Sequence, residues 1–199
     1  MEDDDNLDRI EQILGYHFFE RQHLIRALTH PAYANELIQQ NMICMDQEAY
    51  STLGDAVLKT SLILFLMEKG FQGKGAITQA KETIEDNRSL AKVGRRLKIK
   101  RFIRVGRGEK DLWRSGEETI LADTMEALIG AIFLDSDTGF GVVKQCIGSW
   151  FEPELRKVKK EQPEEQKGKS AGPVSPPPVS SRREPPRAAK RPWRRSSKQ

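Results

Sequence analysis

The sequence predicts an all-α protein, and three observations support this prediction. Apolar residues recur at every third or fourth position along most of residues 1–155, which is the spacing of one helix face. No stretch of this region alternates between apolar and polar residues as a strand with hairpin turns would. The remaining segment is rich in Pro, Ser and Arg, a composition typical of disorder. We therefore expect a helical domain over residues 1–155 and a disordered basic tail over residues 156–199.

The first half of the domain contains three predicted helices. The first ends at Gly15, a common helix-stop residue. The second surrounds Leu24 and ends before Pro31, because a residue that precedes proline avoids helical geometry. A long helix follows over residues 47–70, and its lower half is apolar on most sides. Such a helix is usually buried at the centre of a bundle.

The second half continues the helical pattern with one interruption. Two shorter amphipathic helices are predicted between residues 77 and 97. Residues 98–114 contain two glycines and many basic residues without a clear period, which predicts a loop. Ser115 and Glu118 have the spacing of a capping box, so the next helix should begin there. A last helix is expected over residues 140–150.

Charge divides the chain into two parts. Residues 166–199 contain ten Lys and Arg residues and one acid, a formal charge of +9. Since the whole chain carries +4, residues 1–165 carry −5. A disordered basic segment can contact RNA phosphates without sequence preference, and Trp193 could stack on an exposed base. The alternative is a tail that only improves solubility or adheres to ribosomes.

Several classes of protein are excluded by composition. The longest nearly apolar run, residues 56–67, is interrupted by Lys59 and falls short of the roughly 20 residues of a membrane span. The acidic N-terminus lacks the apolar core of a signal peptide. Cys44 and Cys146 have neither disulfide-scaffold nor zinc-site spacing. We therefore expect a cytoplasmic protein that does not associate with membranes.

Two groups of acids on apolar helices are candidates for chemistry. Asp123 and Glu126 are three residues apart and share a helix face. Glu48 and Asp55 flank Ser51 near the start of the long helix. Carboxylates gathered on core helices repel one another unless a cation neutralises them, and oxygen ligands suit magnesium or manganese. The alternative is that they form an ordinary solvated face, since most charged residues are exposed.

Gly54, next to Asp55 in the long helix, is a second sign that this part of the helix has a special role. A glycine in a helix interior costs about 1 kcal/mol relative to alanine. Its position beside Asp55 therefore indicates that another part of the protein approaches the backbone closely there.

These segments resemble the ribonuclease III family. Residues 48–58 look like its signature helix, and residues 120–135 look like its second acidic motif. Three further segments match in the family's order: residues 28–33, 87–91 and 105–109. The match spans about residues 5–150. A C-terminal double-stranded-RNA-binding domain is not expected, because the residues after Glu152 are too few and too polar to form one.

The resemblance implies an enzyme, a helical hydrolase that cuts double-stranded or structured RNA such as precursor ribosomal RNA. It implies products with 5′-phosphate and 3′-hydroxyl ends, and a homodimer that cuts both strands. Asp55 and Glu126 match the family's catalytic acids. Asp55, Asp123 and Glu126 are then the expected ligands of Mg²⁺, with Glu48 as an outer participant and Mn²⁺ as a possible substitute.

The sequence departs from the family pattern at two positions in the signature helix. Ser51 replaces a metal-binding glutamate, and Glu48 cannot simply substitute for it, since it lies roughly 10 Å along the helix from Asp55. Thr52 replaces an aromatic residue that contacts the partner subunit, and Tyr50 is a possible replacement. Ser51 therefore favours an alternative function, a catalytically impaired domain that binds RNA or ribosomes. A third possibility, a helical dimerisation module with a basic arm, requires both acidic motifs to be coincidental.

Overall fold

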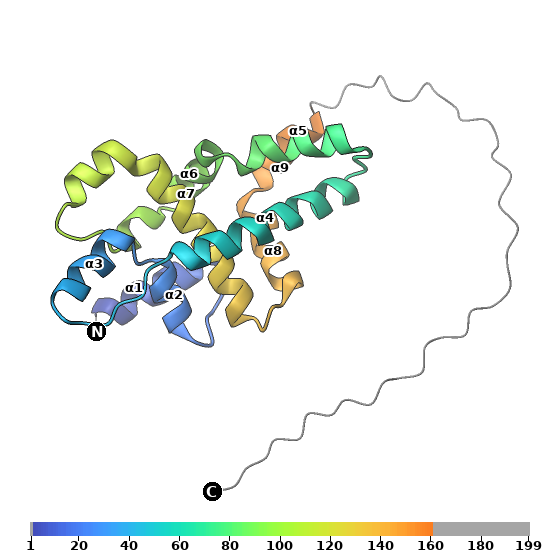
Figure 1. The fold of residues 1–199 in the computed structure, drawn as a ribbon. Helices are drawn as coiled ribbons and strands as arrows, with labels where there is room; N and C mark the ends of the chain where they lie inside the picture. Colours follow the sequence, from blue (N-terminus) through green and yellow to red (C-terminus); the bar gives the residue numbers. More distant parts are fainter. Residues whose placement is uncertain (1, 161–199) are drawn as a thin grey trace, which may run out of the picture. The chain divides into compact units, whose positions relative to one another are not determined.

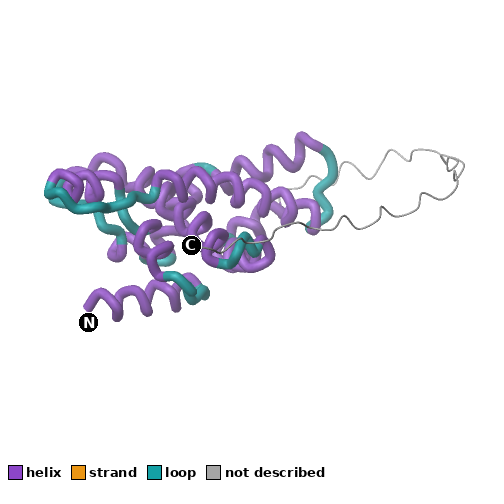
Figure 2. The backbone as a smooth tube through the Cα atoms, turned by 60° about the horizontal axis from the view of Figure 1, so that its bottom comes forward, coloured by secondary structure: helices purple, strands orange, loops and turns teal. Residues whose placement is uncertain are grey.

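The computed structural model describes residues 2–160, which form helices joined by short connections (Figure 1). The elements in chain order are α1 (Glu2–Leu14), α2 (Arg21–Ala27), α3 (Pro31–Gln39), α4 (Glu48–Glu68), α5 (Lys74–Glu85), α6 (Asn87–Arg96), the 3₁₀ turn η1 (Ile99–Phe102), α7 (Glu109–Asp135), α8 (Phe140–Trp150) and α9 (Glu152–Lys160). Over residues 2–160 Figure 2 shows helices and loops without a strand. The extended pairing there is limited to one isolated bridge between Thr29 and Arg104. The predicted all-α class is therefore confirmed for these residues.

The predicted basic tail lies outside the described residues from position 161 onward. The domain boundary between residues 155 and 156 therefore stays a prediction.

The core is built around α4 and α7, which cross at the centre of the domain (Figure 1). α7 also packs against α6 and α2. The largest fully buried side chains on the two central helices include Leu58, Leu62 and Leu66 on α4, and Leu121, Met125 and Leu128 on α7. Full burial of each such side chain contributes about 1.5–3 kcal/mol. The crossing of α4 and α7 is therefore a central part of the hydrophobic core.

α4 is long and apolar enough to cross a membrane by length and composition. In the fold Val57, Leu58, Leu62 and Leu66 of this helix are buried in the core, which includes its packing against α7. It is the buried core helix that its sequence pattern predicts.

Most predicted helix ends agree with the structure. Gly15 follows α1 with a left-handed φ of +68°, which suits a helix stop. The second helix ends at Ala27, before Pro31 as expected. Pro31 also starts α3, a short helix that the sequence analysis missed. His30 caps α3, since its Nδ1 accepts a hydrogen bond from the Ala32 amide at 3.1 Å.

Two predictions about the second half are wrong. Residues 98–114 are not a single loop, because they contain η1 and the first turns of α7. Ser115 does not begin a helix. Its hydroxyl donates to the Asp111 carbonyl inside α7 at 2.7 Å. The local irregularity is a kink at Gly116, where φ is −141°. The sequence analysis also missed α9, which buries Leu155 and Val158.

Candidate active site at the crossing of α4 and α7

Two glycines let the backbones of α4 and α7 come into direct contact. A Cβ atom on Gly54 would lie 1.8 Å from the carbonyl oxygen of Glu126, and a Cβ on Gly130 would lie 2.3 Å from that of Tyr50. Neither position can hold a side chain without separating the helices. The close approach expected at Gly54 is therefore the backbone of α7, and it brings the two acidic motifs together.

Ser51 and Glu126 form the central contact between the motifs. The Ser51 hydroxyl donates a hydrogen bond to Glu126 Oε2 at 2.8 Å, across 75 residues of sequence. One turn further along α4, the Lys59 ammonium donates to Asp55 Oδ2 at 2.7 Å. This ion pair is partly exposed, with 45% of the Lys59 side chain and 36% of the Asp55 side chain accessible. Asp55 thus faces Glu126 while it is held by a lysine of its own helix.

The environment of Glu126 favours a proton on its carboxyl group. Burial, foremost, and the negative charges of Asp55 and Asp123 raise the pKa of Glu126 to about 7. The hydrogen bond from Ser51 and the charge of Lys59 act in the opposite direction but do not compensate. A carboxyl group with such a pKa is partly protonated near neutral pH unless a cation compensates its charge.

Asp123 belongs to a neighbouring group with different partners. Burial is the main cause that raises its pKa, the charge of Glu48 raises it further, and His30 lowers it. The pKa of His30 is itself lowered, chiefly by burial. Glu48 is exposed at the first position of α4, and it interacts with Asp123 and His30. The structure therefore places Asp55 and Asp123 each within electrostatic reach of Glu126, and Glu48 within electrostatic reach of Asp123.

A metal site is not preformed in this arrangement. Within residues 2–160, no group of three or more His, Cys, Asp or Glu side chains is arranged to hold an ion. The donor chemistry nevertheless suits a hard cation, because the crossing offers carboxylate and hydroxyl oxygens and an excess of negative charge. Asp55 and Asp123 would have to move for their oxygens to converge with those of Glu126.

The sequence analysis missed two residues near these acids. Lys59 is four residues after Asp55, a spacing that places the two side chains on one helix face and could have been noticed. His30, the cap residue of α3, is the second. Its proximity to Asp123 depends on the tertiary fold, so no local pattern could reveal it.

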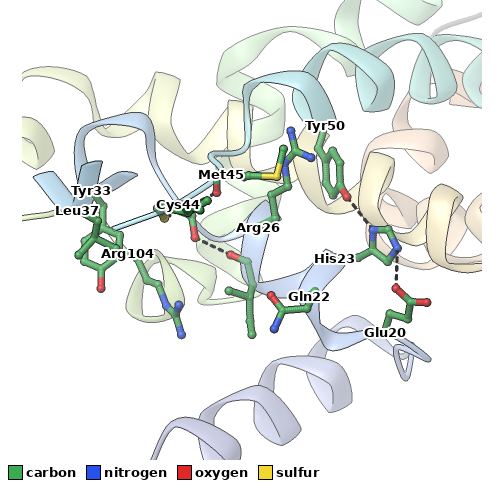
Figure 3. A pocket seen from close by; sticks show the side chains of 13 residues that line it. Glu20, Gln22, His23, Arg26, Tyr33, Leu37, Cys44, Met45, Tyr50 and Arg104 are labelled. Atoms are coloured by element: carbon green, nitrogen blue, oxygen red, sulfur yellow. Dashed lines mark hydrogen bonds and ion pairs between the residues drawn. The ribbon is translucent and has the colours of Figure 1, made fainter. Parts of the chain in front are cut away.

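Tyr50 lies on the opposite side of the start of α4, in a surface pocket of about 500 Å³ (Figure 3). Its hydroxyl is 2.8 Å from His23 Nδ1, and the Arg26 guanidinium lies 4.4 Å from the centre of its ring. Figure 3 shows the Tyr50 hydroxyl pointing at His23. Tyr50 therefore makes its contacts with His23 and Arg26 of its own chain.

One family model matches most of the domain. A model described as ribonuclease-III-like matches residues 20–155, which include both acidic motifs and Gly54 and Gly130. The chain belongs to the ribonuclease III-like family. The recognition made from the sequence motifs is confirmed.

Individual relatives agree with this ribonuclease III-like assignment. The chain is 34% identical over 154 residues to Ribonuclease 3 of Pseudomonas aeruginosa, and 35% identical over 150 residues to that of Streptomyces coelicolor. These matches cover 77% and 74% of this chain, and 62% and 51% of the two relatives. The chain thus spans about three fifths of the first relative's length and half of the second's.

A solved structure supports the fold. The nuclease domain of ribonuclease III from Campylobacter jejuni matches with a TM-score of 0.65 and 29% identity. The match covers 75% of this chain and 99% of that domain. The work on that domain concerns structural flexibility in a region involved in its dimer formation.

Proposed function

We propose that this protein is a metal-dependent endoribonuclease that cleaves double-stranded or structured RNA, leaving 5′-phosphate and 3′-hydroxyl ends. The observation that carries the proposal is the glycine crossing, which brings Asp55 of α4 to Asp123 and Glu126 of α7. Acids in this arrangement on two core helices have no evident structural purpose. Burial and the charges of Asp55 and Asp123 raise the pKa of Glu126, and the hydrogen bond from Ser51 does not offset this rise.

In this proposal Asp55, Asp123 and Glu126 hold Mg²⁺, and Mn²⁺ could substitute for it. Glu48 takes part from the outside, through its interaction with Asp123. The ion would act as a Lewis acid that acidifies water and neutralises charge on the phosphate being cut. Asp55 and Glu126 are the catalytic acids.

The other side chains orient these acids. Ser51 donates to Glu126 Oε2 and so fixes the direction of that carboxylate. Gln47, at the start of α4, accepts a hydrogen bond from Thr124 at 3.1 Å through its amide oxygen. This buried contact stabilises the register between α4 and α7 next to Asp123.

We further propose that the protein acts in the cytoplasm as a homodimer on substrates such as precursor ribosomal RNA. A twofold enzyme matches the near-twofold backbone of a duplex. A-form RNA is read mainly through its shape, phosphates and 2′-hydroxyls, which agrees with broad sequence tolerance.

Cleavage of a long perfect RNA duplex by the purified protein tests this proposal, with Mg²⁺, Mn²⁺ or EDTA present. We expect cutting with either metal and none in EDTA. Asp55→Asn and Glu126→Gln should each abolish cutting while the fold and RNA binding persist. Glu118→Gln, on the exposed surface of α7, is the matched control and should cut normally. Cleavage retained in both site variants would contradict the assignment.

One observation favours a second candidate function. Ser51 supplies a neutral oxygen where an acid would bind metal more strongly. In addition, the Lys59 ammonium is already paired with the Asp55 carboxylate. A catalytically impaired domain that binds RNA or ribosomes would share these features. Duplex binding without cutting in any metal, by a well-folded protein, would favour this candidate.

A further inference from the structure

Lys59 places a positive charge directly on one of the proposed metal ligands. Its ammonium is 2.7 Å from Asp55 Oδ2, and it also interacts electrostatically with Glu126. Both members of the ion pair are partly exposed, so either can change rotamer without disturbing the core. A divalent ion that binds Asp55 must therefore displace this ammonium or share the carboxylate with it.

We propose that Lys59 is a resident cation of this site, which competes with the divalent metal for Asp55 and so determines its metal affinity. The inference rests on the proposed function, because it takes Asp55 and Glu126 as metal ligands. Ser51 strengthens the effect, since its neutral hydroxyl leaves the crossing with less negative charge to attract a metal. Lys59 is a positioning residue here, because it acts through Asp55.

Glu85 on α5 offers the displaced ammonium a second partner. Its Oε1 accepts a hydrogen bond from Lys81, and Lys59 is close enough to interact with it electrostatically. Among the side chains that the structure describes, Glu85 Oε2 is buried without any hydrogen-bond partner. An unpaired buried oxygen of a charged group is costly. Movement of Lys59 from Asp55 to Glu85 would relieve this cost as the metal binds.

The test measures metal binding without RNA and without turnover. Mn²⁺ is titrated into the purified full-length protein, and the free ion is followed by electron paramagnetic resonance. Lys59→Met should bind Mn²⁺ on the order of tenfold more tightly, the effect of removing one nearby charge at a partly screened site. Lys59→Arg keeps the charge and should bind like the wild type. Lys69→Met, about 15 Å further along the same helix axis, is the matched control and should also bind like the wild type.

A double-mutant cycle tests the role of Glu85. Glu85→Gln should weaken Mn²⁺ binding in the wild-type background, because Lys59 then loses its alternative partner. The same substitution should have a clearly smaller effect in the Lys59→Met background. Equal effects in both backgrounds would overturn the role given to Glu85.

Other outcomes are equally decisive. Unchanged or weaker binding by a folded Lys59→Met variant would overturn the competition, as would a total absence of Mn²⁺ binding in every variant. Thermal unfolding in EDTA checks that each variant folds, and Lys59→Gln provides a second neutral side chain. The result is separate from that of the proposed function. Tighter binding without RNA cleavage would support the competition alone, and cleavage without a change in affinity would support the nuclease alone.

Discussion

The Ser51 hydroxyl lies where an acidic side chain would add a negative charge to the proposed metal site. It donates to Glu126 Oε2 at 2.8 Å, so a longer acidic side chain at residue 51 would reach the same carboxylate. A hydroxyl is a weaker ligand for a hard cation than a carboxylate. Residue 51 therefore controls how much magnesium the proposed nuclease needs.

We expect Ser51→Glu to raise RNA cleavage at low magnesium. The added carboxylate supplies another anionic ligand, so the Mg²⁺ concentration at half-maximal rate should fall several-fold. Initial cleavage rates of an RNA duplex, measured across a magnesium series, check this expectation. Ser51→Ala is the control and should not lower the magnesium requirement. A rate that is unchanged or reduced at all magnesium concentrations would show that the site is built differently.

The pKa of Glu126 predicts a pH-dependent stability in the absence of metal. Its folded-state pKa is raised from 4.5 to about 7, so the folded protein binds the proton more tightly than the unfolded chain does. The stabilising contribution of this proton is complete below pH 4.5 and disappears as the pH rises through about 7.

We therefore expect Glu126→Gln to be more stable than the wild type at pH 8 in EDTA, and to lose this advantage near pH 4.5. Urea unfolding of both proteins at the two pH values measures the difference, and the subtraction removes the contributions of other groups. An equal difference at both pH values would mean that the environment of Glu126 is not as described.

At the scale of elements, the glycine pair determines how closely α4 and α7 pack. Two effects compete when Gly54 is replaced by alanine. Helix propensity favours alanine by about 1 kcal/mol, whereas the new Cβ would overlap the carbonyl of Glu126 at 1.8 Å. The overlap prevails, because the carbonyl belongs to a buried backbone that cannot move alone.

Gly54→Ala should lower the free energy of unfolding by about 3 kcal/mol, in the upper range for overpacked cores. It should also reduce activity, because Asp55 moves away from Glu126. Chemical unfolding checks the stability, with Gly75→Ala as the control, since nothing lies within 4 Å of a Cβ at that helical position. A stable and active Gly54→Ala variant would contradict the described crossing.

At the scale of the whole molecule, exposed apolar residues between α3 and α4 are candidates for the contact of the proposed homodimer. Ile43 is fully exposed and Met45 is 61% exposed, in the segment between α3 and α4. They lie beside the pocket that contains Tyr50, which makes contacts within its own chain. Thr52 is too short to act as an aromatic plug. We therefore assign the proposed dimer contact to the 40–47 segment.

Ile43→Ser combined with Met45→Ser should shift the protein from dimer toward monomer in sedimentation velocity. Met67→Ser, which replaces an equally exposed methionine on α4, is the control and should leave the dimer intact. A double variant that sediments like the wild type would place the contact elsewhere.

The all-helical class, the main helices and the family could be predicted from residues alone, because they depend on local spacing and on motifs. The special role of Gly54 could also be predicted, since a glycine inside a helix has a known cost. The pattern was insufficient where helices are short or irregular. α3 and α9 are short and bury few apolar side chains, and the first turns of α7 are separated from the rest of that helix by the kink at Gly116.

The sequence by itself determined which acids share a helix face, because residues three or four apart always do. Only the tertiary structure decided which faces meet. It forms the hydrogen bond between Ser51 and Glu126. It also places Glu48 where it interacts electrostatically with Asp123 and His30. It also brings Glu85 of α5 near Lys59. The physical reason is that these partners come from different helices, whose relative positions depend on the packing of the whole core around the crossing of α4 and α7.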